Sequence, residues 1–478
     1  MKKILLIVAL LFSATILAAC NTERGYSDCE NPDGTQACWS ADDENFRWEE
    51  DAVISIGVDN DTMGAALVEK WDADFPALAG KLEFRNYGSA NGANSGVQGI
   101  QDSQGEAPDV ALVIDNEVTG RVGSLLPLHE YFQDLGAAQT LNSAFTEINA
   151  TANTYYLPAF YDGMTFSWNE TMLTQFGVDL TDANEDGLPD AIDTWEKIFA
   201  WANEWETLAE RPTFTYTKAD DTVVNNKILE VFPISLDEPW SGYSSLTAGG
   251  WQLFPEGDMT APGFDDAEFR TGLEFIKAFS ETSMSVDDTG AKKPASSMGW
   301  RWDSYLDGAY PFSLVGTWMD VQSKVDENNL TFRFSPMPTY NGVQLTPLMK
   351  TKGFVINGFT EAPSAASEVL RWVYTKEVME LVVETSTYLP ALEADAAIFP
   401  EIEQAWKAEF SLGMALNRLE PGGTLPEAAT IRAMDVYYVI GITDYYKAVW
   451  DGDETPASAQ TAIVSAAQAW ITANNVAA

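Results

Sequence analysis

The chain has 478 residues, of which 72 are acidic and 27 basic, so its formal net charge is −45 at pH 7. Such a surface excludes the basic patch that nucleic-acid binding requires, and we interpret the acidity as a source of solubility. With 46% hydrophobic residues, the chain can form two or three domain-sized cores or one large two-lobed fold.

The first twenty residues predict a secretory signal peptide. Lys2 and Lys3 precede a short apolar run, residues 4–12, which is too short to span a membrane as a helix. The ending Leu-Ala-Ala-Cys, residues 17–20, resembles the lipobox of bacterial lipoproteins. The resemblance implies that residues 1–19 are removed and that Cys20 carries lipid, which would anchor an extracytoplasmic protein to the cell membrane. The alternative is an ordinary secretory signal followed by a coincidental cysteine.

Residues 20–51 are polar and predict a flexible tether that precedes the folded body. Two further cysteines, Cys29 and Cys38, flank the turn-forming residues 31–34, a spacing that allows a small hairpin disulfide outside the cytoplasm. His129 is the one histidine in the sequence, and no G-x-S-x-G motif accompanies it. The sequence therefore gives no support for a histidine-rich metal centre or a Ser-His-Asp triad.

The body alternates strands and helices, which predicts an α/β fold. A strand over residues 52–57 is followed by a helix with apolar residues from 65 to 75, a strand over 81–85 and a near-continuous apolar strand over 109–114. Later elements follow the same rhythm. They are helices over residues 195–208, 266–280, 365–384, 430–449 and 456–474, and strands over 153–157, 163–168, 229–235, 311–316, 331–336 and 353–357.

Six short motifs in this order resemble the extracellular solute-binding proteins of sugar ABC importers, of the maltose-binding-protein type. The motifs are G-x-x-P-D-V at 105–110, a P…G-x-x-Y-N segment at 158–169 with Trp168 in place of Tyr, T-W-E at 194–196, G-x-W at 316–318, a strand-to-helix join at 353–367, and x-L-P-A at 388–391. Each motif is weak alone, and together they cover about residues 52–470. The segment 215–228 departs from the pattern, so the identity of the ligand is left open.

The resemblance implies a two-lobed periplasmic-binding-protein fold of type II, with the ligand cleft between lobes that close by a hinge motion. By that resemblance, lobe I takes residues 52–162 and 338–385, and lobe II takes residues 163–337 and 386–478. The hinge would run near residues 160–165, 336–340 and 385–390. We expect a monomer that binds a sugar or oligosaccharide, contacts a membrane permease, and binds no nucleic acid.

Ligand-binding candidates are aromatic residues that could stack on a sugar ring and acidic or amide residues that could accept hydrogen bonds from hydroxyl groups. The resemblance points to Trp318 of the G-x-W motif, to Glu238 and Trp240 of a Glu-Pro-aromatic segment, and to Asp162 near the hinge. Position at the carboxyl ends of predicted strands adds further residues. These are Asp115, Asn116 and Glu117 after residues 109–114, and Asp59, Asn60 and Asp61 after residues 52–57. An aromatic cluster adds Trp300 and Trp302, although these side chains could equally belong to the core.

Residues 182–193 have the spacing of an EF-hand-like calcium loop. Oxygen-bearing side chains stand at positions 1, 3, 5, 9 and 12, Gly187 stands at position 6, and Leu188 at position 7 would offer its carbonyl oxygen. The expected ligands are Asp182, Asn184, Asp186, Leu188, Asp190 and Asp193. The alternative is an acidic turn whose last residues cap the next helix.

Three other functions remain open from the sequence. The same fold could bind a solute that is not a sugar, although a phosphate ligand should want cations and the candidate residues are acidic and aromatic. Paired carboxylates and aromatic residues would also suit a glycoside hydrolase. A calcium-dependent adhesin is the third alternative. The motif order favours a binding protein without catalytic residues.

Overall fold

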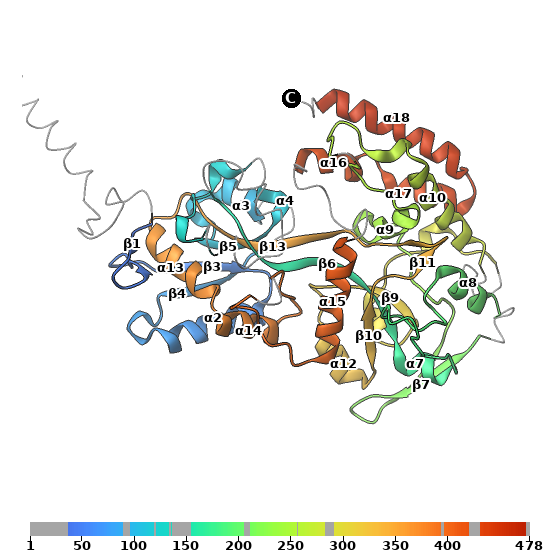
Figure 1. Cartoon of the computed structure of the whole chain (residues 1–478), viewed down its shortest axis with the longest axis horizontal. Coiled ribbons are helices and arrows are strands. Elements are labelled where there is room, and N and C mark those ends of the chain that lie inside the picture. The colour runs from blue at the N-terminus through green and yellow to red at the C-terminus, as the bar shows by residue number, and fades with distance from the viewer. Residues whose placement is uncertain are drawn as a thin grey trace, which may run out of the picture.

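The structure is a computed structural model, and it describes residues 37–88, 96–118, 121–132, 135, 154–204, 211–255, 257–282, 291–392, 396–419 and 431–474. These residues form two lobes, joined by strands that run from one into the other (Figure 1). In this described part, no helix is both long enough and apolar enough to cross a membrane.

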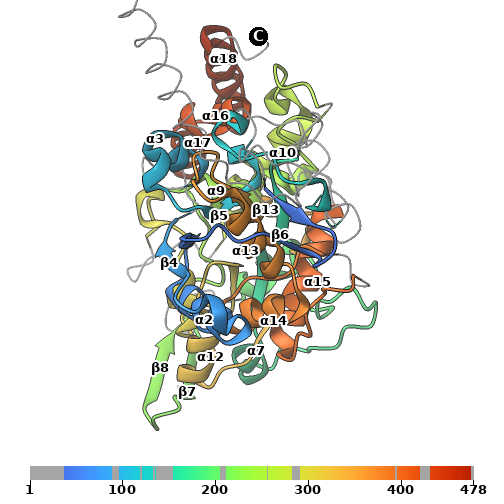
Figure 2. The same ribbon diagram turned by 90° about the vertical axis from the view of Figure 1, so that its left-hand side faces the viewer.

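Lobe I is built on three parallel strands whose order in the sheet is β4, β3, β5. Successive residues of β5 point to opposite faces: Val110 and Leu112 enter one apolar cluster, and Ala111 and Val113 enter another. The sheet is therefore covered on both sides, as parallel sheets generally are. Figures 1 and 2 show α2 beside α14 on one face. The elements are β3 (Ile54–Val58), α2 (Asp61–Asp74), β4 (Leu82–Asn86), α3 (Gly96–Ser103), β5 (Val110–Ile114), α4 (Asp115–Val118), α13 (Pro363–Val373) and α14 (Lys376–Thr385).

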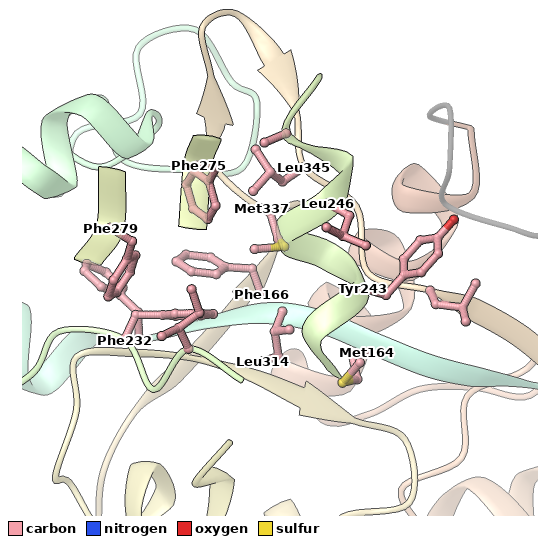
Figure 3. Packing of buried hydrophobic residues seen from close by; sticks show 14 of the residues in the cluster. Met164, Phe166, Phe232, Tyr243, Leu246, Phe275, Phe279, Leu314, Met337 and Leu345 are labelled. Carbon is pink, nitrogen blue, oxygen red and sulfur yellow. The ribbon is translucent and has the colours of Figure 1, made fainter. Parts of the chain in front are cut away.

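Lobe II surrounds the larger apolar cluster, part of which Figure 3 shows around Phe166 and Phe232. Its strands are β7 (Thr213–Thr217), β8 (Val223–Lys227), β9 (Phe312–Gly316), β10 (Phe332–Ser335), β11 (Thr339–Tyr340) and β12 (Val343–Gln344). Its helices are α7 (Glu170–Gln175), α8 (Trp195–Asn203), α9 (Pro239–Leu246), α10 (Ala267–Ser280), α11 (Trp302–Leu306), α12 (Val321–Asn328), α15 (Ala405–Leu419), α16 (Ile431–Val439), α17 (Ile442–Asp451) and α18 (Pro456–Asn474). Short 3-10 turns lie at Pro76–Leu78, Gln104–Glu106, Val122–Ser124, Thr247–Gly249, Gly263–Asp265 and Ala295–Ser297.

Two long strands carry one sheet through both lobes. β6 (Leu157–Asn169) pairs with β13 (Met349–Ile356) in its first half and with β9 and β10 in its second half. The ladder between β6 and β13 shifts register between Lys352 and Gly353. A Cβ atom on Gly353 would lie 2.1 Å from the carbonyl oxygen of Leu157, so this close approach of two backbones requires glycine.

The tether predicted over residues 20–51 is wrong for residues 37–50, which pack on lobe I. β1 (Trp39–Ser40) and β2 (Asn45–Phe46) form a small hairpin. The carboxylate of Glu49 accepts hydrogen bonds from the backbone N–H groups of Ser364 and Ala365, so it caps the start of α13. Phe46 stacks on Phe132. Cys38 is disulfide-bonded, and its partner cysteine lies outside the described residues, so the pairing with Cys29 stays a prediction.

Several predicted elements differ from the structure for local reasons. β6 (Leu157–Asn169) contains the strand predicted over 163–168 but only the last residue of the one predicted over 153–157. Residues 229–235 form no strand, since Pro233 lacks the N–H donor that a ladder needs. The helix predicted over 430–449 breaks at Gly441, whose φ is 71°, and becomes α16 and α17. The helix predicted over 365–384 is likewise two helices, α13 and α14.

The two cores place the second crossing later than predicted. Met337, Leu345 and Leu348 belong to the cluster of lobe II, whereas Phe354 and Ile356 belong to that of lobe I. Residues 338–348 therefore pack with lobe II, and the predicted boundary at residue 338 is wrong; the chain crosses within β13. At the third crossing, Tyr388 packs in lobe I and Leu389 in lobe II, within the predicted hinge segment 385–390.

Candidate functional site

A cavity of about 390 Å³ opens between the lobes, a volume within the usual range for small-molecule sites. Lobe I contributes the start of α2 and the end of α14, lobe II contributes the start of α12, and the third crossing segment closes one side. Its lining residues are Asp59, Asn60, Thr62, Thr317, Trp318, Met319, Asp320, Gln322, Ser323, Glu384, Thr385, Ser386, Thr387, Tyr388 and Lys407.

Trp318 is the aromatic side chain that this cavity presents to solvent. It is 39% exposed, which is unusual for a residue that large. Its indole packs against the backbone of Gly316. The approach is so close that a Cβ atom on residue 316 would lie 2.8 Å from the ring carbon Cζ2. The glycine of the G-x-W motif is thus what allows the tryptophan to lie across the end of β9.

Trp240 and Trp300 support Trp318 from lobe II. Their ring centroids lie 6.5 and 6.1 Å from that of Trp318, and both pairs meet edge to face. The Trp300 indole N–H donates to the carbonyl oxygen of Leu314, which fixes its orientation. The structure therefore brings together three of the four predicted tryptophans. Trp302, like Trp240 and Trp300, packs against the core of lobe II and does not line the cavity, so its place in the site stays a prediction.

Glu238 is half-buried at the start of α9, where it is the N-cap. Its carboxylate accepts hydrogen bonds from the backbone N–H groups of Trp240 and Ser241 and from the Ser241 hydroxyl. Glu238, predicted to bind ligand, therefore caps α9, and this cap fixes the position of Trp240 beside Trp318. A carboxylate has about four acceptor sites, so Glu238 can still accept a hydrogen bond from a ligand.

Asp59 and Asp162 meet around a lysine that the sequence analysis missed. The Lys352 Nζ lies 3.0 Å from Asp59, 3.3 Å from Asp162 and 2.7 Å from the hydroxyl of Tyr388. The Tyr388 hydroxyl in turn donates to Asp59. Burial alone would lower the pKa of Lys352, but Asp162, Tyr388 and Asp59 together raise it well above its usual value. The lysine is therefore charged, although its side chain is almost fully buried.

The residues after β5 have structural partners. Asp115 is buried and accepts hydrogen bonds from the backbone N–H and the hydroxyl of Thr351, and the buried ammonium of Lys350 lies 3.8 Å away. Asp115 does not line the cavity, so its prediction as a ligand-binding residue is not supported by its placement. The side chain of Asn116 lies outside the described residues.

Glu117 is buried and accepts a hydrogen bond from the backbone N–H of Val97 through Oε2, while its Oε1 has no partner among the described residues. Burial raises its pKa to about 7, opposed by the Val97 hydrogen bond and by Arg121. Glu117 lies beside the charges of Asp162 and Lys352 and does not line the cavity.

Asp61 also lies outside the cavity, where it accepts a hydrogen bond from Asn86 at 2.6 Å. This placement does not support the predicted ligand-binding role of Asp61.

The acidic loop over residues 182–193 folds around Asp182. The backbone N–H of Gly187 donates to Asp182 Oδ2 at 3.0 Å, and that of Ala183 donates to Asp190. Asp182 Oδ1 is buried and has no hydrogen-bond partner in the described part of the chain. Asp193 pairs with Lys197 at 2.7 Å. Nowhere in the described residues do three or more His, Cys, Asp or Glu side chains gather closely enough to hold a metal ion.

Sequence reasoning missed the buried lysines near the cavity and the residues of the third crossing. Lys350 and Lys352 were visible as two lysines in an otherwise apolar strand, a pattern that indicates buried ion pairs. Lys407 is buried at the start of α15 and donates to the carbonyl oxygens of Val383 and Ser386. Burial lowers its pKa to about 8. Asp320, the N-cap of α12, follows Trp318 by two residues and could have been predicted from the same motif.

A two-lobed α/β protein with an aromatic, acidic cavity between its lobes has the architecture of a binding protein for a small solute. The family model described as bacterial extracellular solute-binding protein matches residues 82–409. Because that match spans more than half of the sequence, the chain belongs to this family. The family is one of extracellular binding proteins, so the chain is a binding protein and not a hydrolase.

A solved structure gives the same answer for the fold. The chain is similar to the maltodextrin binding protein MalE1 from L. casei BL23 without ligand, with a TM-score of 0.60 and 14% identity over 88% of this chain and 98% of that chain. At this identity the likeness shows the fold, and it confirms the predicted two-lobed periplasmic-binding-protein architecture. No curated protein matches the chain in sequence.

Replacing Lys352 with methionine should destabilise the protein strongly, because Asp59 and Asp162 would keep buried charges without their counter-ion. Breaking a buried ion pair from one side costs about 3–5 kcal/mol. The double variant Lys352→Met with Asp162→Asn should recover part of the loss. The measurement is urea unfolding followed by tryptophan fluorescence.

The control is Lys70→Met, which breaks the exposed pair of Lys70 with Asp74 on α2. Exposed pairs contribute about 0–1 kcal/mol, so this variant should unfold close to the wild type. If Lys352→Met were as stable as Lys70→Met, the buried network would have no role in holding the crossing segments together.

Proposed function

We propose that the protein is the substrate-binding component of an ABC importer, and that it captures a sugar or oligosaccharide between its two closing lobes and delivers it to a membrane permease. The observation that supports this most is Trp318, an exposed indole held across a cavity between lobes and flanked by two further tryptophans. The family membership and the fold agree with this proposal.

The chemistry of the cavity suits a sugar. An indole face packs well on the C–H face of a pyranose, and carboxylate oxygens accept strong hydrogen bonds from its hydroxyl groups. Trp318 provides the first kind of contact, and Asp59, Asp320 and Glu384 provide the second. The structurally similar maltodextrin binding protein is a sugar-binding example of the same fold.

Thermal unfolding of residues 23–478 against a panel of neutral mono- and oligosaccharides tests the proposal. A sugar at about 100 times its Kd should add about 2.7 kcal/mol of stability and raise Tm by a few degrees. The Trp318→Ala variant should lose that shift. Gly316→Ala should weaken it, because the new methyl group displaces the indole.

Phe359→Ala provides a matched control for the loss of an exposed aromatic side chain. Phe359 is 40% exposed and does not line the cavity, so this variant should keep the sugar-induced shift. A folded protein that responds to no sugar in the panel would contradict the proposal and favour a non-sugar solute in the same fold.

We also propose that Cys20 carries lipid and anchors the protein to the outer face of the cell membrane. The support is the order of charged, apolar and small residues before Cys20 in the sequence. Cells that express Cys20→Ala should release the protein from the membrane fraction, and a radiolabelled fatty acid should label the wild type alone. The control is Cys29→Ala, which should stay membrane-bound. Equal labelling of wild type and Cys20→Ala would contradict the anchor.

A calcium ion in the loop over residues 182–193 is a further proposal. Its supports are the EF-hand-like spacing, the turn closed by Gly187 on Asp182, and the unpartnered Asp182 Oδ1. The carboxylates would have to turn inward on binding, since they are not gathered around a common point. The role would be structural, before the start of α8.

Calcium at millimolar concentration should raise Tm by a few degrees relative to EDTA, and Asp182→Asn should remove the effect. Asp220→Asn, in the exposed turn between β7 and β8, is the control and should respond to calcium as the wild type does. An unchanged Tm in calcium would rule out a stabilising ion in this loop.

A further inference from the structure

The carboxylates of the cavity come from both lobes. Asp59 follows β3 and Glu384 lies in the last turn of α14, both in lobe I, while Asp320 caps α12 in lobe II. Asp320 and Glu384 are solvent-exposed. When the lobes close, as the proposed function requires, these like charges approach one another across the ligand.

The positive charges near the cavity are directed into the protein. Of the described residues that line the cavity, Lys407 is the one lysine or arginine, and its ammonium donates to two backbone carbonyl oxygens. The ammonium of Lys352 behind the cavity is bonded to Asp59, Asp162 and Tyr388. All three N–H groups of Lys352 thus have an acceptor, and Lys407 is buried with two of its three N–H groups bonded to the backbone.

The helix N-termini at the cavity do not offset its negative charge. α2 and α12 both begin there, and a helix N-terminus carries a partial positive charge. However, the Asn60 side chain accepts from the backbone N–H of Met63, and the Asp320 carboxylate accepts from that of Ser323. The second cap adds a full negative charge to the same place.

We propose that this cavity selects against anionic solutes, and that Asp320 and Glu384 are its specificity-determining residues. The inference rests on the proposed sugar function and narrows it to neutral or amino sugars. A hydroxyl or ammonium group donates hydrogen bonds to the carboxylates and relieves their repulsion as the lobes close. A carboxylate or phosphate on the solute adds to that repulsion.

Matched sugars test the inference. Calorimetric titration would compare glucose, glucosamine and glucuronate, their galactose counterparts, and trisaccharides of the same units. We expect amino sugars to bind at least as tightly as neutral ones, and uronic sugars to bind at least about tenfold more weakly, which is about 1.4 kcal/mol. Because Asp320 and Glu384 are exposed, the difference should shrink in 0.5 M salt.

The double variant Asp320→Asn with Glu384→Gln should reduce the tenfold difference to about threefold or less, since asparagine keeps the cap on α12. The control Glu69→Gln with Glu377→Gln removes two exposed charges that do not line the cavity, and should leave the difference intact. If neutral and uronic sugars bind equally well to the wild type, the charge selection is overturned. If no sugar of any charge binds, the sugar function fails and this inference fails with it.

Discussion

The ammonium group of Lys352 on β13 is the point at which the three crossing segments are fixed to one another and to lobe I. Its three partners lie on three different parts of the chain: Asp59 after β3, Asp162 in the crossing strand β6, and Tyr388 in the third crossing segment. A buried ammonium costs several kcal/mol unless each of its N–H groups finds an acceptor in good geometry. The crossing segments are therefore held in one arrangement, because the Lys352 ammonium needs an acceptor from each of its three partners.

The same network also reaches the cavity. Asp59 and Tyr388 line it, and Lys352 lies directly behind them. A solute that donates a hydrogen bond to Asp59 therefore changes the balance of charge around Lys352, and with it the interaction that joins lobe I to the crossing strands. Trp318 is connected to this centre through the backbone, because β9 ends at Gly316, whose partner in β6 is Met164, two residues after Asp162. Asp59 and Tyr388 thus both line the cavity and bind the lysine that fixes the crossing segments.

The sequence was informative where the local pattern decides the structure. The G-x-W motif located Trp318, and the apolar run over residues 109–114 located β5, because both depend on neighbours in the chain. The sequence was not informative where a residue far away in the chain decides the local structure. Pro158 and Gly163 look like strand breakers, yet β6 runs through both because β13 and β9 pair with it. Asp59 and Asp61 follow the same strand, but only Asp59 reaches the cavity, since Asp61 turns to Asn86. Lys352 was missed because its three partners are far away in sequence.

The net charge of −45 makes an acidic cavity unremarkable in itself, so the information lies in the placement of the cations. Lys350, Lys352 and Lys407 all lie close to the space between the lobes, and each is directed to an internal acceptor: a carboxylate, a tyrosine hydroxyl or a backbone carbonyl. A cavity for an anion would present such groups to the ligand. Here they neutralise carboxylates or bind carbonyl oxygens beneath the surface, and the acceptors that remain at the surface are those that suit a ligand rich in hydrogen-bond donors. The contacts of Lys352 and Lys407 thus explain the chemistry of the cavity, because fixing the crossing segments uses the lysines that an anionic ligand would need.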